Sequence, residues 1–259
     1  MPTLTDSHVH LDDPAFAHDR DAVILRAKQA GIDVMVVPAV DFDSWQRIKT
    51  LCARHEHIHA CYGLHPMFLA RHTPEHLEAL PAWLDRERPV ALGEIGLDFH
   101  TPDTDHERQR FYFSQQLTLA RERDLPVIVH ARDALEEVSL TLRRCGGLRG
   151  VVHSFSGSEQ QARQLWNAGF HLGIGGPITH ERAQRLRRIV ANMPIEFLLL
   201  ESDAPDQPGA THRGQRNEPA YIIDILRCIA KLRSESEADI AIATSANARR
   251  LFGLVQPHD

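Results

Sequence analysis

Eight short apolar segments rich in β-branched residues alternate with longer amphipathic segments along most of this chain. They recur roughly every 20 to 37 residues, the spacing expected when each strand of a parallel sheet is followed by a helix. The count of eight predicts one (β/α)8 TIM barrel, as a single domain over residues 1–259, with a doubly wound open sheet as the alternative. The predicted strands span residues 4–8, 34–40, 58–63, 90–94, 127–130, 151–154, 171–174 and 197–201.

The segments between these strands carry the three- to four-residue apolar spacing of helices. The longest places Phe113, Leu117 and Ala120 on one face, and Ser158 with Gln161 three residues later predicts a capping box. No low-complexity linker marks a domain boundary. The predicted helices include residues 22–30, 106–123, 183–190, 219–232 and 238–252.

Composition excludes several classes of protein. The 259 residues carry a formal net charge of -6, so no broad basic field attracts nucleic acid, and any such substrate must be held locally. No apolar run approaches the roughly 18–20 residues that span a bilayer, and the N-terminus does not resemble a signal peptide. The four cysteines lack C-x-x-C spacing and are predicted to be reduced, as in a cytoplasmic protein.

Two histidines, His8 and His10, end the first predicted strand. A strand has a side-chain period of two, so both imidazoles point to the same face, which is the interior of a barrel. Two imidazoles side by side in an interior are costly unless they share a cation. The alternative is a pair of hydrogen-bonded histidines in a turn. The metal-binding residue types at the other strand ends favour a metal site over this alternative.

Four further metal-binding residue types follow other predicted strands: Glu94, His130, His153 and Asp203. Alone, each is compatible with a structural histidine, a helix cap or a surface loop. Together they lie at one end of the barrel, and closure puts Asp203 beside the histidine pair. Two metals about 3.5–4 Å apart need a bridging anion. None of the three lysines lies at a strand end to supply a carbamate, so Glu94 is the predicted bridge.

Substrate contacts are predicted at the same end of the barrel. His65 follows the third strand in Gly63–Pro66 and is interpreted as a substrate contact, not as a metal ligand. Arg132, Arg213 and Arg216 are candidates to hold substrate phosphates, because a guanidinium fork matches phosphate geometry. An ordinary surface charge is the alternative for each arginine.

Seven segments that contain these residues, except Arg213, resemble, in order, the motifs of the TatD-type metal-dependent hydrolases (TatD DNase family), a branch of the amidohydrolase-like barrels. They span residues 6–11, 63–66, 93–98, 126–132, 153–157, 201–205 and 216–219, and residues 244–252 resemble the family's last helix. One departure is Ser202, where the family usually has Thr. The resemblance implies a (β/α)8 barrel in which one metal is held by His8, His10 and Asp203, the other by His130 and His153, with Glu94 as bridge.

We therefore expect a hydrolase with two divalent cations, Zn, Mn or Mg, and with Glu94 and Asp203 as catalytic residues. The favoured reaction is hydrolysis of phosphodiester bonds in DNA ends or single strands by a water activated between the metals, as in a 3′–5′ exonuclease. Asp203 is the predicted proton acceptor. A metal-dependent acyl or amide hydrolase, such as an aminoacyl-tRNA deacylase, is the first alternative, because the same metals polarise a carbonyl. A non-catalytic metal-holding scaffold is the second.

Overall fold

The structure is a computed structural model that describes residues 3–101 and 104–254. Eight strands form one sheet in the order β1 to β8, and each neighbouring pair is parallel. Every predicted strand is present, with ends that differ by a few residues. The strands are β1 Leu4–Asp6, β2 Ile32–Pro38, β3 Ile58–Tyr62, β4 Ala91–Asp98, β5 Val127–Arg132, β6 Gly150–Val152, β7 Phe170–Ile174 and β8 Leu198–Leu200.

The sheet closes where the segment after β8 meets the segment after β1. The backbone N–H of Ser7 donates to the carbonyl of Leu200 (3.0 Å), and the N–H of Asp203 donates to the carbonyl of His8 (3.0 Å). The Ser7 hydroxyl adds a second bond to Leu200 O (2.9 Å). These contacts complete a (β/α)8 barrel, so the predicted fold is confirmed and the open-sheet alternative is wrong.

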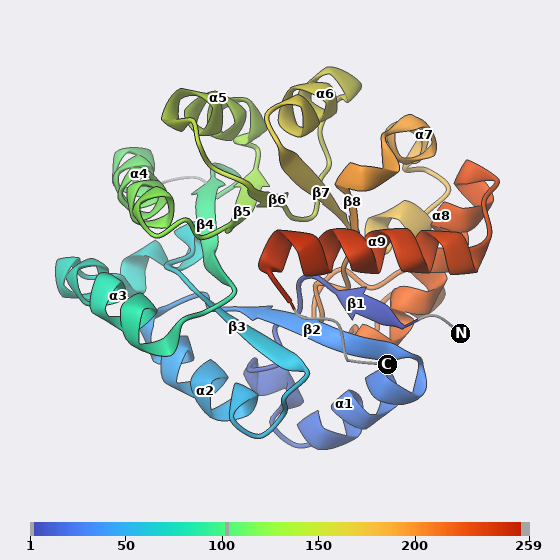
Figure 1. The fold of residues 1–259 in the computed structure, drawn as a ribbon, viewed down its shortest axis with the longest axis horizontal. Coiled ribbons are helices and arrows are strands. Elements are labelled where there is room, and N and C mark those ends of the chain that lie inside the picture. Colours follow the sequence, from blue (N-terminus) through green and yellow to red (C-terminus); the bar gives the residue numbers. More distant parts are fainter. Residues whose placement is uncertain (1–2, 102–103, 255–259) are drawn as a thin grey trace.

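Helices surround the strands, and α9 crosses in front of them in the view of Figure 1. The predicted capping box begins α6: the Ser158 hydroxyl accepts from Gln161 N–H, and the Gln161 side chain accepts from Ser158 N–H. Among the described residues, no helix is both long enough and apolar enough to cross a bilayer. The helices are α1 Arg20–Gln29, α2 Phe42–Cys52, α3 Pro74–Glu87, α4 His106–Glu122, α5 Leu135–Cys145, α6 Glu159–Asn167, α7 Gln184–Asn192, α8 Ile222–Arg233 and α9 Glu237–Phe252.

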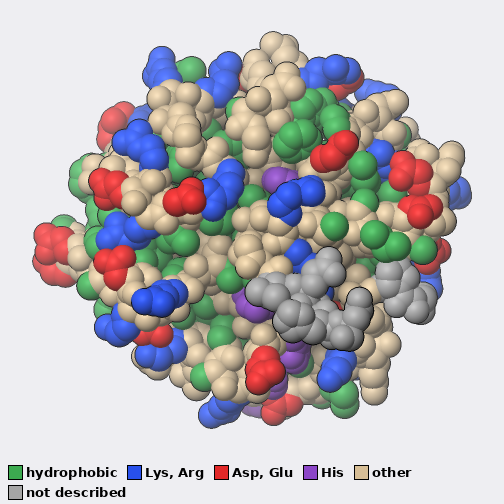
Figure 2. Space-filling model, in the orientation of Figure 1, with side chains coloured by type: hydrophobic (Ala, Val, Ile, Leu, Met, Phe, Trp, Pro, Cys, Tyr) green, Lys and Arg blue, Asp and Glu red, His purple; other side chains and the backbone are tan. Residues whose placement is uncertain are grey.

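Helix α9 fills the amino-terminal end of the barrel. Its Leu251 and Phe252 pack in one buried cluster with side chains of six strands, among them Val36 and Ile128. The Asn247 side chain donates to two carbonyls at the start of β8 (2.7 and 3.0 Å), which fixes the helix against the strands. Acidic and basic side chains are interspersed over this face (Figure 2). Because this end is plugged by apolar side chains, a polar site is left to the carboxyl end.

Gly96 lets β4 and β5 approach closely and gives a test of the barrel. Its φ is +143°, and a Cβ added there would overlap the carbonyl oxygen of His130 on β5. Gly31 also has positive φ (+89°), but a Cβ there would meet no atom within 4 Å. We expect Gly96→Ala to lower the free energy of unfolding by on the order of 3 kcal/mol, because a backbone clash is added to strain. Gly31→Ala should cost only about 1 kcal/mol. Equal losses in urea unfolding would contradict this account.

Candidate metal centre

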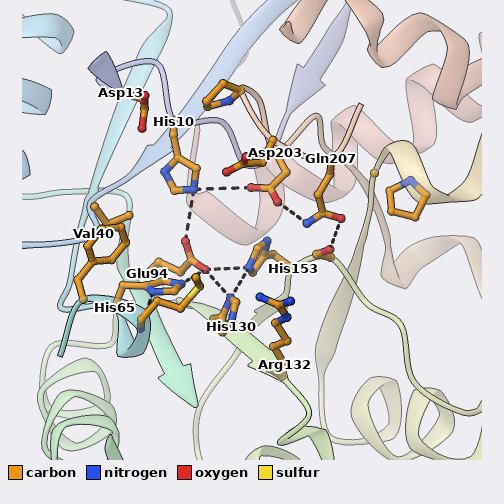
Figure 3. Close-up of a pocket in the computed structure, with 18 of the residues that line it drawn as sticks. His10, Asp13, Val40, His65, Glu94, His130, Arg132, His153, Asp203 and Gln207 are labelled. Atoms are coloured by element: carbon orange, nitrogen blue, oxygen red, sulfur yellow. Dashed lines mark hydrogen bonds and ion pairs between the residues drawn. The ribbon is translucent and has the colours of Figure 1, made fainter. Parts of the chain in front are cut away.

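The six predicted ligand side chains converge at the carboxyl end of the barrel, where Figure 3 shows five of them by label around one cavity. His8 and His10 follow β1, Glu94 lies within β4, His130 lies within β5, and His153 and Asp203 follow β6 and β8. Sequence positions up to 195 residues apart are thus brought within contact distance. Glu94 lies at the centre and is 1% exposed.

One group consists of the Oε2 atom of Glu94 and three atoms of His8, His10 and Asp203. His8 Nε2 lies 3.1 Å from His10 Nε2, 3.3 Å from Glu94 Oε2 and 3.5 Å from Asp203 Oδ1. His10 Nε2 lies 3.6 Å from each of the two carboxylate oxygens. Four ligands about 2.0–2.1 Å from a zinc ion in a tetrahedron are about 3.3–3.4 Å from one another. These five distances of 3.1–3.6 Å are close to that value, and His8, His10 and Glu94 together form a group that could hold a metal ion.

A second group surrounds the other oxygen, Oε1 of Glu94. His153 Nε2 lies 2.8 Å and His130 Nδ1 3.2 Å from this oxygen, and the two nitrogens are 3.2 Å apart. His65 Nε2 also lies 2.8 Å from Oε1. The two oxygens of one carboxylate thus face two separate groups of imidazoles.

Burial and neighbouring charges set the ionisation of the centre. Burial alone raises the pKa of Glu94, but the imidazoles of His65, His153 and His8 outweigh it and hold that pKa well below its usual range. Burial, with His153 nearby, lowers the pKa of His8 well below its ordinary value. Glu94 is therefore a carboxylate and His8 a neutral imidazole, the forms that bind metals.

Unpaired polar atoms support the same assignment. Among the described residues, Glu94 Oε2 has no hydrogen-bond partner although it is fully buried. A buried carboxylate oxygen without a hydrogen-bond donor is costly unless a cation compensates its negative charge. The donor set and its spacing therefore fit a divalent metal ion on this oxygen.

Carboxylates behind the ligands form a supporting layer that sequence reasoning missed. Asp98 Oδ2 lies 2.8 Å from His130 Nε2, and the Ser202 hydroxyl donates to Asp6 Oδ2 (2.6 Å). Ser202 therefore keeps the hydroxyl that a threonine would supply. Asp98 was missed because the predicted strand ended at Glu94, whereas β4 continues to Asp98.

Glu201 is a further, fully buried member of this layer. Its carboxylate accepts from Ser154 N–H (2.5 Å) and lies 3.9 Å from His153 Nδ1. It occupies the space that a side chain at Gly173 would fill. Burial raises the pKa of Glu201 to about 8, so this carboxyl group carries a proton near neutral pH.

A cavity of about 670 Å³ opens above the centre. Of the three arginines predicted to hold phosphates, Arg132 lines it, and no hydrogen bond or ion pair ties its guanidinium to any described residue. Arg213 is exposed and is not among the lining residues. Arg216 is also outside the lining and is held by Asp19 (2.7 Å) and Glu218 (3.0 Å). These ion pairs engage the Arg216 guanidinium, and its role as a phosphate contact stays a prediction.

Comparison with known proteins gives one consistent result. A family model described as TatD related DNase matches residues 5–253. A metal-dependent hydrolase of Escherichia coli K12, YjjV, is 40% identical over 252 residues, covering 96% of this chain and 97% of that protein. The crystal structure of YjjV superimposes with a TM-score of 0.92 at 38% identity, covering 96% of this chain and 98% of that one.

A Salmonella typhimurium protein named 3′-5′ ssDNA/RNA exonuclease TatD is 36% identical over 261 residues, which cover 97% of this chain and all of that protein. The match therefore extends over the barrel and over all the segments that carry the candidate ligands. The chain belongs to the TatD family of metal-dependent hydrolases.

Proposed function

We propose that this protein binds two divalent metal ions bridged by Glu94 and hydrolyses phosphodiester bonds at the ends of single-stranded nucleic acid. The observation that carries the proposal is the division of the Glu94 carboxylate between two groups of imidazoles. Oε2 faces His8 and His10, whereas Oε1 faces His130 and His153. One metal ion on each side gives both groups a common anionic ligand.

In this proposal one metal is held by His8, His10 and Asp203, and the other by His130 and His153. When bound, two such cations lower the pKa of a water and draw charge from phosphoryl oxygens. Imidazole ligands favour Zn over Mg by ligand softness, and the carboxylates of the site also suit Mn. We therefore propose Zn or Mn as the resident metal.

Asp203 is the proposed proton acceptor. Its Oδ1 faces the imidazoles, while its Oδ2 accepts from the Gln207 side chain (2.5 Å). Burial raises the pKa of Asp203 above its ordinary value, which brings it closer to the range useful for a general base. The side chain also lines the cavity, so it lies within reach of an attacking water.

His65 is proposed as a positioning residue; it also lines the cavity, and its predicted substrate contact stays a prediction. Its Nδ1 accepts from Met67 N–H (3.1 Å), so the proton of the neutral ring is on Nε2, which donates to Glu94 Oε1. Burial lowers the pKa of His65 to about 4, so the ring stays neutral. With both ring nitrogens engaged, His65 orients the bridging carboxylate.

A chain end is the proposed substrate because the site lies in a cavity ringed by loops, and a strand end enters such a cavity more easily than the middle of a duplex. Arg132 is the proposed phosphate contact, as the unpaired cation of the lining. The net charge of -6 is consistent with few phosphate contacts. The relative named as a single-strand exonuclease supports the same substrate class.

A substrate panel tests the proposal. Purified protein loaded with Zn, Mn or Mg is incubated with 5′-labelled single-stranded DNA, RNA and duplex DNA, and with aminoacyl-tRNA and a chromogenic ester. We expect stepwise shortening of the single strands that stops with chelator. Brisk ester or aminoacyl-tRNA hydrolysis without any cleavage of nucleic acid would overturn the proposal in favour of acyl chemistry.

Asp98→Asn gives a separate test of the supporting layer. The change removes the charge that holds His130, and loss of such an outer partner typically lowers metal affinity about 10- to 100-fold. Metal competition titration measures the effect. The control is Asp85→Asn, which removes an exposed ion pair with Arg123 far from the centre. Equal affinity in both variants would exclude a role for Asp98 in metal binding.

A further inference from the structure

Two apolar side chains, Met67 and Phe68, lie at the rim of the cavity on the 3-10 segment Pro66–Arg71 that follows β3. Met67 is 52% exposed. Four large hydrophobic side chains are this exposed in the described part of the chain, and of these Met67 is the one among the cavity residues. Exposed apolar groups beside a polar centre mark a place where a ligand with an apolar surface binds.

The ring of Phe68 is held in place by two neighbouring side chains, His65 and Arg71. Its centroid lies 5.7 Å from that of His65 in an edge-to-face arrangement. The Arg71 guanidinium lies over the ring at 5.1 Å, is anchored to Asp41 (3.0 Å), and is not among the lining residues. The part of the ring that lines the cavity is therefore left for another planar group.

The same segment is tied directly to the metal centre. His65 precedes it and accepts from the backbone N–H of Met67 while its other nitrogen meets Glu94. The Phe68 ring is therefore one side chain away from the bridging carboxylate. When the substrate phosphate lies on the metal ions that Glu94 would bridge, the nucleoside attached to that phosphate is within reach of this ring.

Resting on the proposed function, we propose that Phe68, with Met67 beside it, is the stacking platform for the terminal nucleobase of the substrate strand. A nucleobase has a planar π-face that stacks on an aromatic ring whatever its sequence, which suits an enzyme that removes successive nucleotides. The flexible thioether of Met67 adapts to bases of different size. The positively charged guanidinium of Arg132, on β5, would bind the phosphate of the same nucleotide.

Two substrates with the same leaving group test the platform by turnover. Thymidine 5′-(p-nitrophenyl phosphate) carries a base, and methyl p-nitrophenyl phosphate does not. Stacking is worth about 1–3 kcal/mol per base, so Phe68→Ala should lower kcat/KM for the thymidine substrate roughly 5- to 150-fold. The methyl substrate should change less than twofold, and Phe68→Tyr should restore most of the loss. The matched control is Phe111→Ala, at an exposed phenylalanine (53%) outside the cavity lining.

A binding measurement tests the platform without turnover. Calorimetric affinities of the metal-loaded protein for thymidine 5′-monophosphate and for inorganic phosphate are compared. Phe68→Ala should lower the affinity for the nucleotide by the same roughly 5- to 150-fold and leave the affinity for inorganic phosphate unchanged. Parallel losses on both ligands, or no loss on the nucleotide, would overturn the stacking role. If wild type hydrolyses neither phosphodiester, the proposed function fails on its own, and the binding comparison still decides whether Phe68 recognises a base.

Discussion

Glu94→Gln is expected to lower hydrolytic activity by on the order of 10³-fold or more and to remove bound metal. A glutamine keeps the size of the side chain but turns one of the two oxygens into an N–H donor. That donor must face either the His8 and His10 group or the His130 and His153 group, neither of which needs a proton donor. Elemental analysis of protein purified without added metal measures the loss directly.

The control for this prediction is Glu107→Gln. Glu107 is an exposed glutamate of α4 outside the cavity, and its side chain is 86% exposed. It should keep full metal content and activity. Wild-type metal content in Glu94→Gln would mean that the bridging assignment is incorrect, whatever the effect on the rate.

Asp203→Asn is expected to lower kcat by about 10²- to 10⁴-fold while leaving the fold intact. An asparagine cannot accept a proton from water, and it weakens only one of the two metal groups. Metal content should therefore fall partially, because His130, His153 and Glu94 are unchanged. Steady-state kinetics together with elemental analysis separates these two effects.

The neighbouring carboxylate provides the matched control for Asp203→Asn. Asp206 also lines the cavity but is exposed, whereas Asp203 is buried and lies 3.5 Å from His8 Nε2. Asp206→Asn should lower kcat far less than Asp203→Asn, because the charge of Asp206 is the smallest of the named influences on the pKa of Asp203. Similar losses in the two variants would point to a general effect of negative charge, not to proton transfer by Asp203.

The barrel was predictable because its strands are short apolar runs with regular spacing. The main error was the end of β4, which was predicted at Glu94 but continues to Asp98. Two glycines and two carboxylates within this stretch resemble a loop in sequence. They form a strand because β5 pairs along it and because His130 engages Asp98. Whether such a segment forms a strand depends on its partner in another strand. The local sequence does not reveal that partner.

The convergence of the six side chains followed from one rule, that parallel strands end at the same side of a barrel. The roles of individual arginines did not follow from any such rule. Arg216 meets Asp19, which lies 197 positions away in the chain, and only the packed structure reveals this pair. The pairing of His65 with Glu94 and the position of Phe68 likewise depend on how the segment after β3 folds over the barrel.

A crystal structure of metal-loaded protein, with anomalous diffraction data collected at the absorption edge of the metal, tests the central claim most directly. The account predicts two anomalous peaks about 3.5–4 Å apart. One should lie beside His8 and His10, the other beside His130 and His153, with one oxygen of Glu94 bound to each. A single peak, or two peaks with Glu94 bound to neither, would contradict it.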